Sequence, residues 1–241
     1  LSQKKSKKMD KITEKKEKEI IDSYSLLYNN KKIRQAVLTY KKLLFLCPKE
    51  AKYYLNYLSL HKEEEVFAEF LQNSYSESLD TCERAINNLD TNDLEPFYQR
   101  KLEIFIELID GSFGSWYNNN TKQVNNFIDE ISGKYSNNIP ILKRLYRLLC
   151  IIDKEHEANI LLNKLYVLTN GNDIEILFSK VGKISETDSN EGIKLLESNI
   201  ENNKNFIPSL NLIYKRLLQL YKTNNNIKMV NHYDTLIDNL N

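Results

Sequence analysis

Hydrophobic residues recur at helical spacing along nearly the whole chain, from about Met9 to Asn241. The segment 31–46 is representative, since its apolar residues fall at i, i+3, i+4 and i+7: Ile33, Ala36, Val37 and Tyr40. Short breaks that contain Asn, Gly or Ser separate such segments, and none of the segments shows the alternation typical of a strand. The pattern therefore predicts an all-α protein.

The helical segments pair into hairpins that recur along the chain. The second helix of each pair begins near Lys31, Ser76, Thr121, Lys154, Asn190 and Asn225, at intervals of 33 to 45 residues. Periods of this length are typical of helical repeats that stack into solenoids, and the short loops favour antiparallel neighbours. The sequence predicts an α-α superhelix (solenoid) of about six antiparallel helical hairpins: 11–47, 48–90, 91–134, 138–168, 171–202 and 205–241.

Residues 11–241 are therefore expected to form a single helical-repeat domain, and residues 1–10 a disordered basic lead-in. The 241 residues include only 6 Gly and 4 Pro, which argues against the many tight turns of an all-β fold. Net charge is +1 overall, so the whole chain is not basic enough to indicate nucleic-acid binding.

The basic residues are concentrated at the start of the chain. Residues 1–19 hold eight Lys against four acidic residues, a net charge of +4, and Lys4, Lys5, Lys7 and Lys8 form the basic segment. Three interpretations stay open: a solvated lead-in to the first helix, a nuclear localisation signal, or a contact for nucleic-acid phosphates or an acidic partner.

Cysteine usage and hydropathy bear on the compartment. Cys47, Cys82 and Cys150 each lie in an apolar helical pattern, so we expect them to be buried thiols in a reducing environment. The sequence shows no secretory signal and no apolar run long enough to span a bilayer. The expected location is intracellular, cytoplasmic or nuclear, with no membrane partner.

Residues 17–50 resemble a tetratricopeptide repeat. With position 1 at Glu17, the twentieth, twenty-fourth and thirty-second positions are Ala36, Tyr40 and Pro48, which match the small, large and exit residues of that family. Ser78, Cys82 and Ala85 repeat the small–large–small spacing. Residues 53–57, followed by Cys82-Glu83-Arg84-Ala85, are also similar to the half-a-tetratricopeptide variety of RNA-processing scaffolds, and the choice between the two varieties stays open.

The resemblance implies a concave groove, and it places two pairs of residues there. With position 1 at Ile139, Lys143 and Arg147 take the fifth and ninth positions, and Tyr214 and Leu218 take the same positions of a later helix. In the family these positions line the groove. Two cations and an aromatic ring would suit an acidic or carboxylate-ended peptide, and the alternative is a solvated helix face.

Phe113 and Trp116 lie in the segment 111–120, which is the longest break that the pattern predicts to be non-helical. An exposed aromatic loop between glycines could anchor a partner. It could equally fold back over the lengthened second and third hairpins, and the sequence favours neither alternative.

No pattern indicates catalysis. His61, His156 and His232 lack neighbours at metal-ligand spacing, so we expect surface histidines, and no phosphate-binding or dinucleotide-binding glycine motif occurs. We therefore predict no enzyme activity, no cofactor and no metal.

The architecture favours a protein-protein interaction scaffold, or adaptor subunit, of a larger intracellular complex. The alternative is a scaffold in an RNA-processing or ribonucleoprotein complex. The identity of the partner and the oligomeric state stay open.

Overall fold

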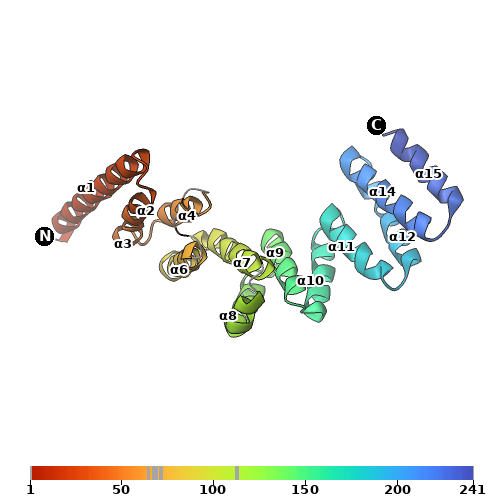
Figure 1. Ribbon diagram of the computed structural model, residues 1–241, viewed down its shortest axis with the longest axis horizontal. Coiled ribbons are helices and arrows are strands. Elements are labelled where there is room, and N and C mark those ends of the chain that lie inside the picture. Colours follow the sequence, from red (N-terminus) through yellow and green to blue (C-terminus); the bar gives the residue numbers. More distant parts are fainter. Residues whose placement is uncertain (1, 64–65, 67–69, 71–72, 112–113, 241) are drawn as a thin grey trace. The chain divides into compact units, whose positions relative to one another are not determined.

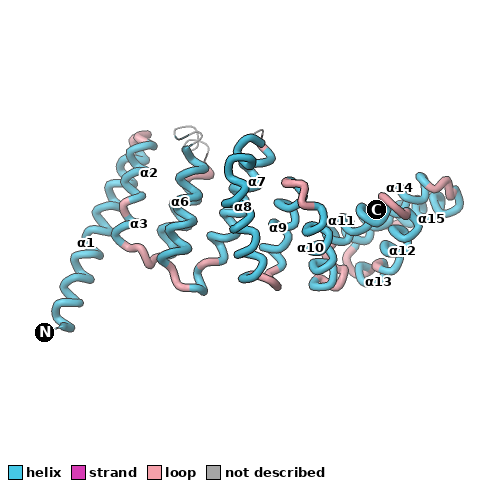
Figure 2. The backbone as a smooth tube through the Cα atoms, turned by 90° about the horizontal axis from the view of Figure 1, so that it is seen from below, coloured by secondary structure: helices cyan, strands magenta, loops and turns pink. Residues whose placement is uncertain are grey.

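A computed structural model describes residues 2–63, 66, 70, 73–111 and 114–240 of the protein. Every element within these ranges is a helix or a loop (Figure 2), which confirms the predicted all-α fold. The chain divides into two compact units, Leu1–Gly133 and Lys134–Asn241. Hairpins that pack mainly on their neighbours in sequence have few interactions with distant parts of the chain, so such a chain divides readily.

Unit 1 contains the first three hairpins. Helix α1 packs on α2 and α3, α4 packs on α6, and α6 packs on α7. Rings of Phe105 and Phe127, 5.3 Å apart, join α7 to α8. The bounds are α1 (Ser2–Asn29), α2 (Ile33–Lys41), α3 (Leu43–Leu46), α4 (Ala51–Leu60), α6 (Asn73–Asn88), the 3-10 turn η1 (Thr91–Asp93), α7 (Glu95–Asp110) and α8 (Gly114–Lys134).

Unit 2 contains three further hairpins among its described residues. They pair α9 with α10, α11 with α12 and α14 with α15, and α14 and α15 lie side by side in Figure 1. The bounds are α9 (Ile139–Ile151), α10 (Glu155–Leu168), α11 (Ile174–Ser185), α12 (Ser189–Ser198), α13 (Ile200–Asn203), α14 (Ile207–Thr223) and α15 (Ile227–Asp238).

Two segments that were expected to be irregular are helical. Helix α1 begins at Ser2, whereas residues 1–10 were predicted to be disordered. Lys is a good helix former, and no Gly or Pro precedes Pro48, so nothing interrupts the helical periodicity toward the start. Helix α8 begins at Gly114, inside the predicted break 111–120.

Three of the hairpins turn in the same way, through residues 30–32, 152–154 and 224–226. The central residues Lys31, Asp153 and Asn225 have φ of 59°, 57° and 54°. In each turn the next amide N–H reaches back five residues to a helix carbonyl: Lys32 to Leu27, Lys154 to Leu149 and Asn226 to Tyr221, each at 3.0 Å. This is the Schellman closure, in which a left-handed residue ends the helix and satisfies its last carbonyls.

Small residues lie where the helices of a hairpin cross. Ala36, Ser78, Ala85 and Ala158 are all buried, as the spacing indicates. Gly192 on α12 is also buried, and a Cβ there would collide with Ser185 Oγ on α11. Small side chains at these positions let the helix axes approach closely.

Hydrogen bonds that join residues about one repeat apart hold neighbouring helices together. Asn199, the residue that follows α12, donates through Nδ2 to Tyr166 Oη on α10 at 3.1 Å, 33 residues away. Lys41 Nζ on α2 donates to Glu77 on α6 at 2.6 Å, 36 residues away. The separation of the paired residues is close to the period of the hydrophobic pattern. Single hydrogen bonds of this kind therefore show that neighbouring hairpins stack like repeats.

Candidate functional site

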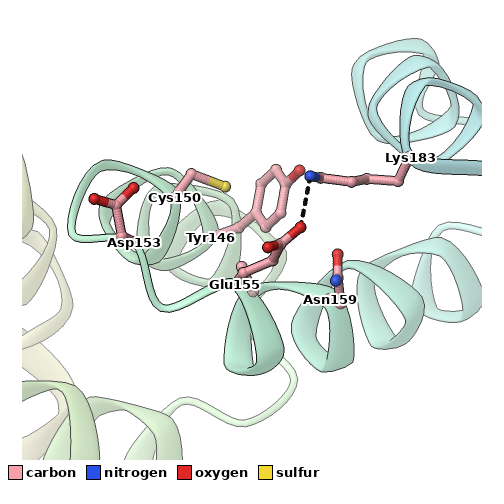
Figure 3. A pocket seen from close by; sticks show the side chains of 7 residues that line it. Tyr146, Cys150, Asp153, Glu155, Asn159 and Lys183 are labelled. Carbon is pink, nitrogen blue, oxygen red and sulfur yellow. Dashed lines mark hydrogen bonds and ion pairs between the residues drawn. The ribbon is translucent and has the colours of Figure 1, made fainter. Parts of the chain in front are cut away.

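The surface of unit 2 carries a pocket of about 240 Å³ where α9, the following turn, α10 and α11 meet (Figure 3). Its polar lining consists of Tyr146, Cys150, Asp153, Glu155, Asn159 and Lys183, and Ala158 closes the apolar side. Tyr146 and Cys150 lie one helical turn apart, so their side chains share a face of α9.

The Schellman turn at Asp153 positions this pocket. It ends α9 and starts α10 only four residues later, which brings the first turn of α10 beside the last turn of α9. Glu155 and Asn159, again one turn apart, therefore face the same space as Cys150. Lys183 reaches in from the far end of α11, and Figure 3 shows its ammonium group beside the Tyr146 hydroxyl and the Glu155 carboxylate.

An ion pair orients the charged groups of the pocket. Lys183 Nζ lies 3.0 Å from Glu155 Oε1 and 3.5 Å from Glu186 Oε2. The hydrogen bond to Glu155 raises the pKa of Lys183, so the ammonium group stays charged at neutral pH. The cation, the carboxylate and the Asn159 amide together offer donors and acceptors suited to a polar segment of another molecule.

Tyr146 stays a neutral hydroxyl in this setting. Burial raises its pKa, the neighbouring Cys150 raises it further, and Ser179 and Lys183 oppose the shift. Cys150 is an exposed free thiol rather than the buried residue that was expected, while Cys82 is buried as predicted. The apolar pattern around Cys150 comes from Leu148 and Leu149, which face the core while Cys150 faces outward.

The predicted groove cation Lys143 is held by acidic residues of the next hairpin. Its Nζ lies 3.1 Å from Asp173 Oδ2 and also pairs with Glu175. Burial alone would lower the pKa of Lys143, but hydrogen bonds to Glu175 and Asp173 raise it. Asp173 is the N-cap of α11 and accepts from the Glu175 and Ile176 amides, so Lys143 links α9 to the start of α11. Arg147 is exposed on α9.

Tyr214 and Leu218 on α14 are half-buried against the core of unit 2. The Tyr214 ring lies 5.6 Å from that of Tyr233 on α15. The hairpin of α11 and α12 packs between α10 and α14. The structure therefore places the two predicted pairs on separate hairpins, and it gives Tyr214 and Leu218 a packing role that the groove hypothesis did not include.

Trp116 lies on α8 and packs on Phe105 of α7, with ring centroids 5.6 Å apart. This contact lies within the third hairpin. Phe113 lies outside the described residues. Lys4, Lys5, Lys7 and Lys8 lie within the backbone range of α1, and their side chains are not among those described.

Sequence reasoning missed the pocket around Lys183 and misplaced one histidine. His61 was expected at the surface, yet it is buried, and its Nδ1 lies 2.9 Å from Ser74 Oγ. The sequence does indicate that His61 is buried, because His61 continues the apolar stripe of Tyr53, Tyr54 and Tyr57 by one helical turn. Among the described residues, no group of three His, Cys, Asp or Glu side chains could hold a metal ion, and no helix is long and apolar enough to cross a membrane.

Comparisons with known proteins bear on the fold alone. No protein-family model matches the chain, and no curated protein sequence matches it. A crystal structure of BtubC (BKLC) from P. vanneervenii is similar, with a TM-score of 0.56 over 87% of this chain and 88% of that chain. The two sequences are 13% identical, so the likeness shows that this helical arrangement occurs in a solved structure and carries no function across.

Proposed function

We propose that the chain is a non-catalytic protein-interaction scaffold of the tetratricopeptide-repeat kind, which binds a segment of a partner protein within a larger intracellular complex. Three observations support the assignment to this kind of repeat. Three hairpins share a Schellman turn, small residues lie where the helices cross, and side-chain hydrogen bonds join residues 33 and 36 positions apart. Stacked hairpins bury their cores against each other and leave extended faces for partners.

The observation that carries the proposal is the pocket at Tyr146, Asn159 and Lys183. It is open, polar and pre-oriented by the Lys183–Glu155 pair. A pocket of about 240 Å³ accommodates one or two side chains of a peptide rather than a large cofactor. Because Lys183 is paired with Glu155, a segment of mixed polarity fits the pocket better than the acidic peptide expected from the sequence.

The test is affinity purification of the full-length protein from its own cells, with and without nuclease, followed by mass spectrometry. We expect one or two stoichiometric protein partners that survive nuclease treatment. Asn159→Arg should fill the pocket and weaken the main partner at least about tenfold, since it removes roughly 1.4 kcal/mol of binding free energy. Asn163→Arg, one turn further along α10 and exposed outside the pocket, is the matched control.

Two results would overturn the proposal. Equal binding by the Asn159 and Asn163 variants would show that the pocket does not hold the partner. Loss of all partners on nuclease treatment, together with an RNA affinity that falls steeply with salt, would instead support the ribonucleoprotein alternative, because phosphate contacts release counterions.

A further inference from the structure

Helix α1 is longer than the hairpin to which it belongs, and the proposed scaffold function does not use its first part. The Tyr53 hydroxyl donates to Glu17, and Lys52 Nζ lies 3.8 Å from the same carboxylate. Five residues nearer the start of the chain, Ile12 is 47% exposed. Figure 2 shows α1 continuing past the end of α3 in this direction. The first part of α1 therefore extends beyond the packed hairpin.

Five lysines of α1 follow one another at alternate spacings of four and three residues. They are called the lysine stripe here: Lys4, Lys8, Lys11, Lys15 and Lys18. With 3.6 residues per turn, the five positions fall within about 80° of one another around the helix axis, over a length of about 21 Å. The helix is continuous from Ser2, so it gives these positions a common face that an irregular lead-in would not have.

The lysine stripe lies on the side of α1 opposite to the packed side. Its described members, Lys15 and Lys18, are exposed, and the side chain of Lys15 is 81% accessible. At 3.6 residues per turn, the half-buried positions of this part of the helix centre about 180° from the stripe. These half-buried residues are Thr13, Glu17, Ile20, Tyr24 and Leu27.

The acidic residues of this segment occupy other positions around the helix. Asp10 and Glu17 fall nearer the packed side, while Glu14 and Glu19 flank the stripe about 60–80° from its centre. Lys15 Nζ lies 3.9 Å from Glu19 Oε1, and an exposed pair of this kind is weak. Successive stripe lysines are helix neighbours, and like charges at this spacing destabilise a helix. A polyanion along the stripe would remove that repulsion.

The residues of this face favour nucleic acid over a membrane. Between positions 4 and 18 the face holds lysines alone, whereas a helix that lies on an anionic membrane also inserts apolar residues. The face offers neither aromatic rings nor amide side chains for reading bases, so its contacts would be to phosphates. A flexible single strand can follow a straight row of cations, whereas each backbone of a duplex winds away from it.

We propose that the lysine stripe of α1 binds the phosphate backbone of single-stranded nucleic acid without sequence preference. The stripe belongs to unit 1 and does not depend on the pocket in unit 2. A protein segment in that pocket and a nucleic-acid strand on α1 are separate contacts.

The test measures the fluorescence anisotropy of a labelled oligouridylate of about 20 nucleotides, titrated with the purified full chain at 50 to 200 mM NaCl. Each phosphate contact on a single strand contributes about 0.7 to the slope of log affinity against log salt, so five lysines predict a slope of about −3.5. An oligocytidylate of the same length should bind with an affinity within about threefold, because the contacts are to the backbone.

Two double variants that remove the same charge test the register of the stripe. Lys11→Gln with Lys15→Gln removes two stripe lysines, which should reduce the slope by about 1.4 and weaken binding at least about tenfold at 0.1 M salt. Lys5→Gln with Lys16→Gln removes two lysines about 100–120° from the centre of the stripe, and it should weaken binding less than about threefold. Circular dichroism confirms that both variants keep their helix.

Three results would overturn the proposal. Equal losses in the two double variants would mean that net charge acts and that the helical face does not. An unchanged affinity in the stripe variant, or no binding by the wild type at 50 mM salt, would remove the site. Displacement of the oligonucleotide by oligoglutamate or by phosphatidylserine vesicles, at an equal or lower concentration of negative charge, would assign the stripe to an acidic protein or to a membrane.

Discussion

The interiors of the two units are built from different side chains. In unit 1 the largest fully buried residues include Tyr54, Tyr57, Tyr98, Phe97 and Phe105. The same unit holds His61, Arg100 and Lys101, which are the buried basic side chains among the described residues. Each of these side chains meets a polar or aromatic neighbour, so the interior of unit 1 depends on specific pairings.

Unit 2 has an aliphatic core. Its central cluster contains Leu177, Val181, Leu196, Ile213 and Leu217, with Tyr233 at its side. The buried polar residues described in this unit are Asn199, Asn203 and Ser209, which carry no charge. The comparison teaches that one helical-repeat architecture can rest on two kinds of interior: unit 2 should respond to lost packing, and unit 1 to lost partners and to pH.

The largest effect is expected from a cavity in the core of unit 2. Leu217 is fully buried, so Leu217→Ala should lower the free energy of unfolding by about 2–5 kcal/mol, from lost apolar burial and the space left behind. Urea denaturation followed by circular dichroism measures this loss. Leu212→Ala, on the same helix with Leu212 44% exposed, is the control and should stay within about 0.5 kcal/mol. Equal losses would contradict the assignment of this core.

The second largest loss of stability is expected in unit 1, where a buried cation can be left without its acidic partner. The buried Lys101 pairs with Glu83, and its ammonium lies 4.2 Å from the centre of the Phe127 ring. Glu83→Ala leaves that cation desolvated and unpaired, at a cost of about 2–3 kcal/mol. Lys101→Met keeps the packing and leaves Glu83 to the solvent, so we expect a change within about 1 kcal/mol. Thermal or urea unfolding compares the two, and a larger loss for Lys101→Met would reverse the argument.

A smaller change in the free energy of unfolding is expected when unit 1 is brought to acidic pH. Burial lowers the pKa of His61 from 6.5 to about 4, opposed by Glu77 and assisted by Lys41 and Arg100. Between those values the unfolded chain binds a proton that the folded chain does not. The contribution of neutral His61 to the free energy of unfolding is therefore fully present above pH 6.5. It is lost as the pH falls toward 4, by about 1–2 kcal/mol at pH 5.

The measurement is the free energy of unfolding at pH 7.5 and pH 5 for the wild type and for His61→Gln. The His61 variant should lose the extra pH dependence, and His156→Gln, at an exposed histidine, should keep it. The same slope in all three proteins would mean that His61 titrates normally in the folded state.

The helical stripes could be predicted from the sequence because they depend on local spacing. Val124, Phe127, Ile128 and Ile131 fall on one face of a helix, and all four are buried. The start of α8 could not be predicted in the same way. The composition of 111–120 favours a loop, and the packing of Trp116 on Phe105 is a tertiary contact that the composition does not contain.

The candidate site could be predicted only in part, because its geometry depends on pairs far apart in sequence. Lys143 was recognised as a cation on α9, but Asp173, which holds it, lies 30 residues away. The partner of Lys183 is Glu155, 28 residues away. Distances of this kind follow from how one hairpin stacks on the next, which a periodic pattern indicates without giving the register.

The smallest predicted change in the free energy of unfolding comes from substitutions in one turn of each unit. Lys31 in unit 1 and Asn225 in unit 2 occupy the same left-handed position of a Schellman turn. A left-handed conformation costs an ordinary L-residue about 1–2 kcal/mol, whereas Asn tolerates it and Gly adopts it freely. Lys31→Gly should therefore raise the free energy of unfolding by about 0.5–1 kcal/mol, after the extra freedom of glycine in the unfolded chain is subtracted.

Asn225→Gly should change the free energy of unfolding by less than about 0.3 kcal/mol, because the residue it replaces already suits the turn. Urea unfolding of the two variants, measured side by side, checks the difference. A gain at Asn225 as large as that at Lys31 would mean that backbone strain is shared equally by the two units. The contrast between them would then lie in their interiors alone, because the turns that start their second helices would be energetically equivalent.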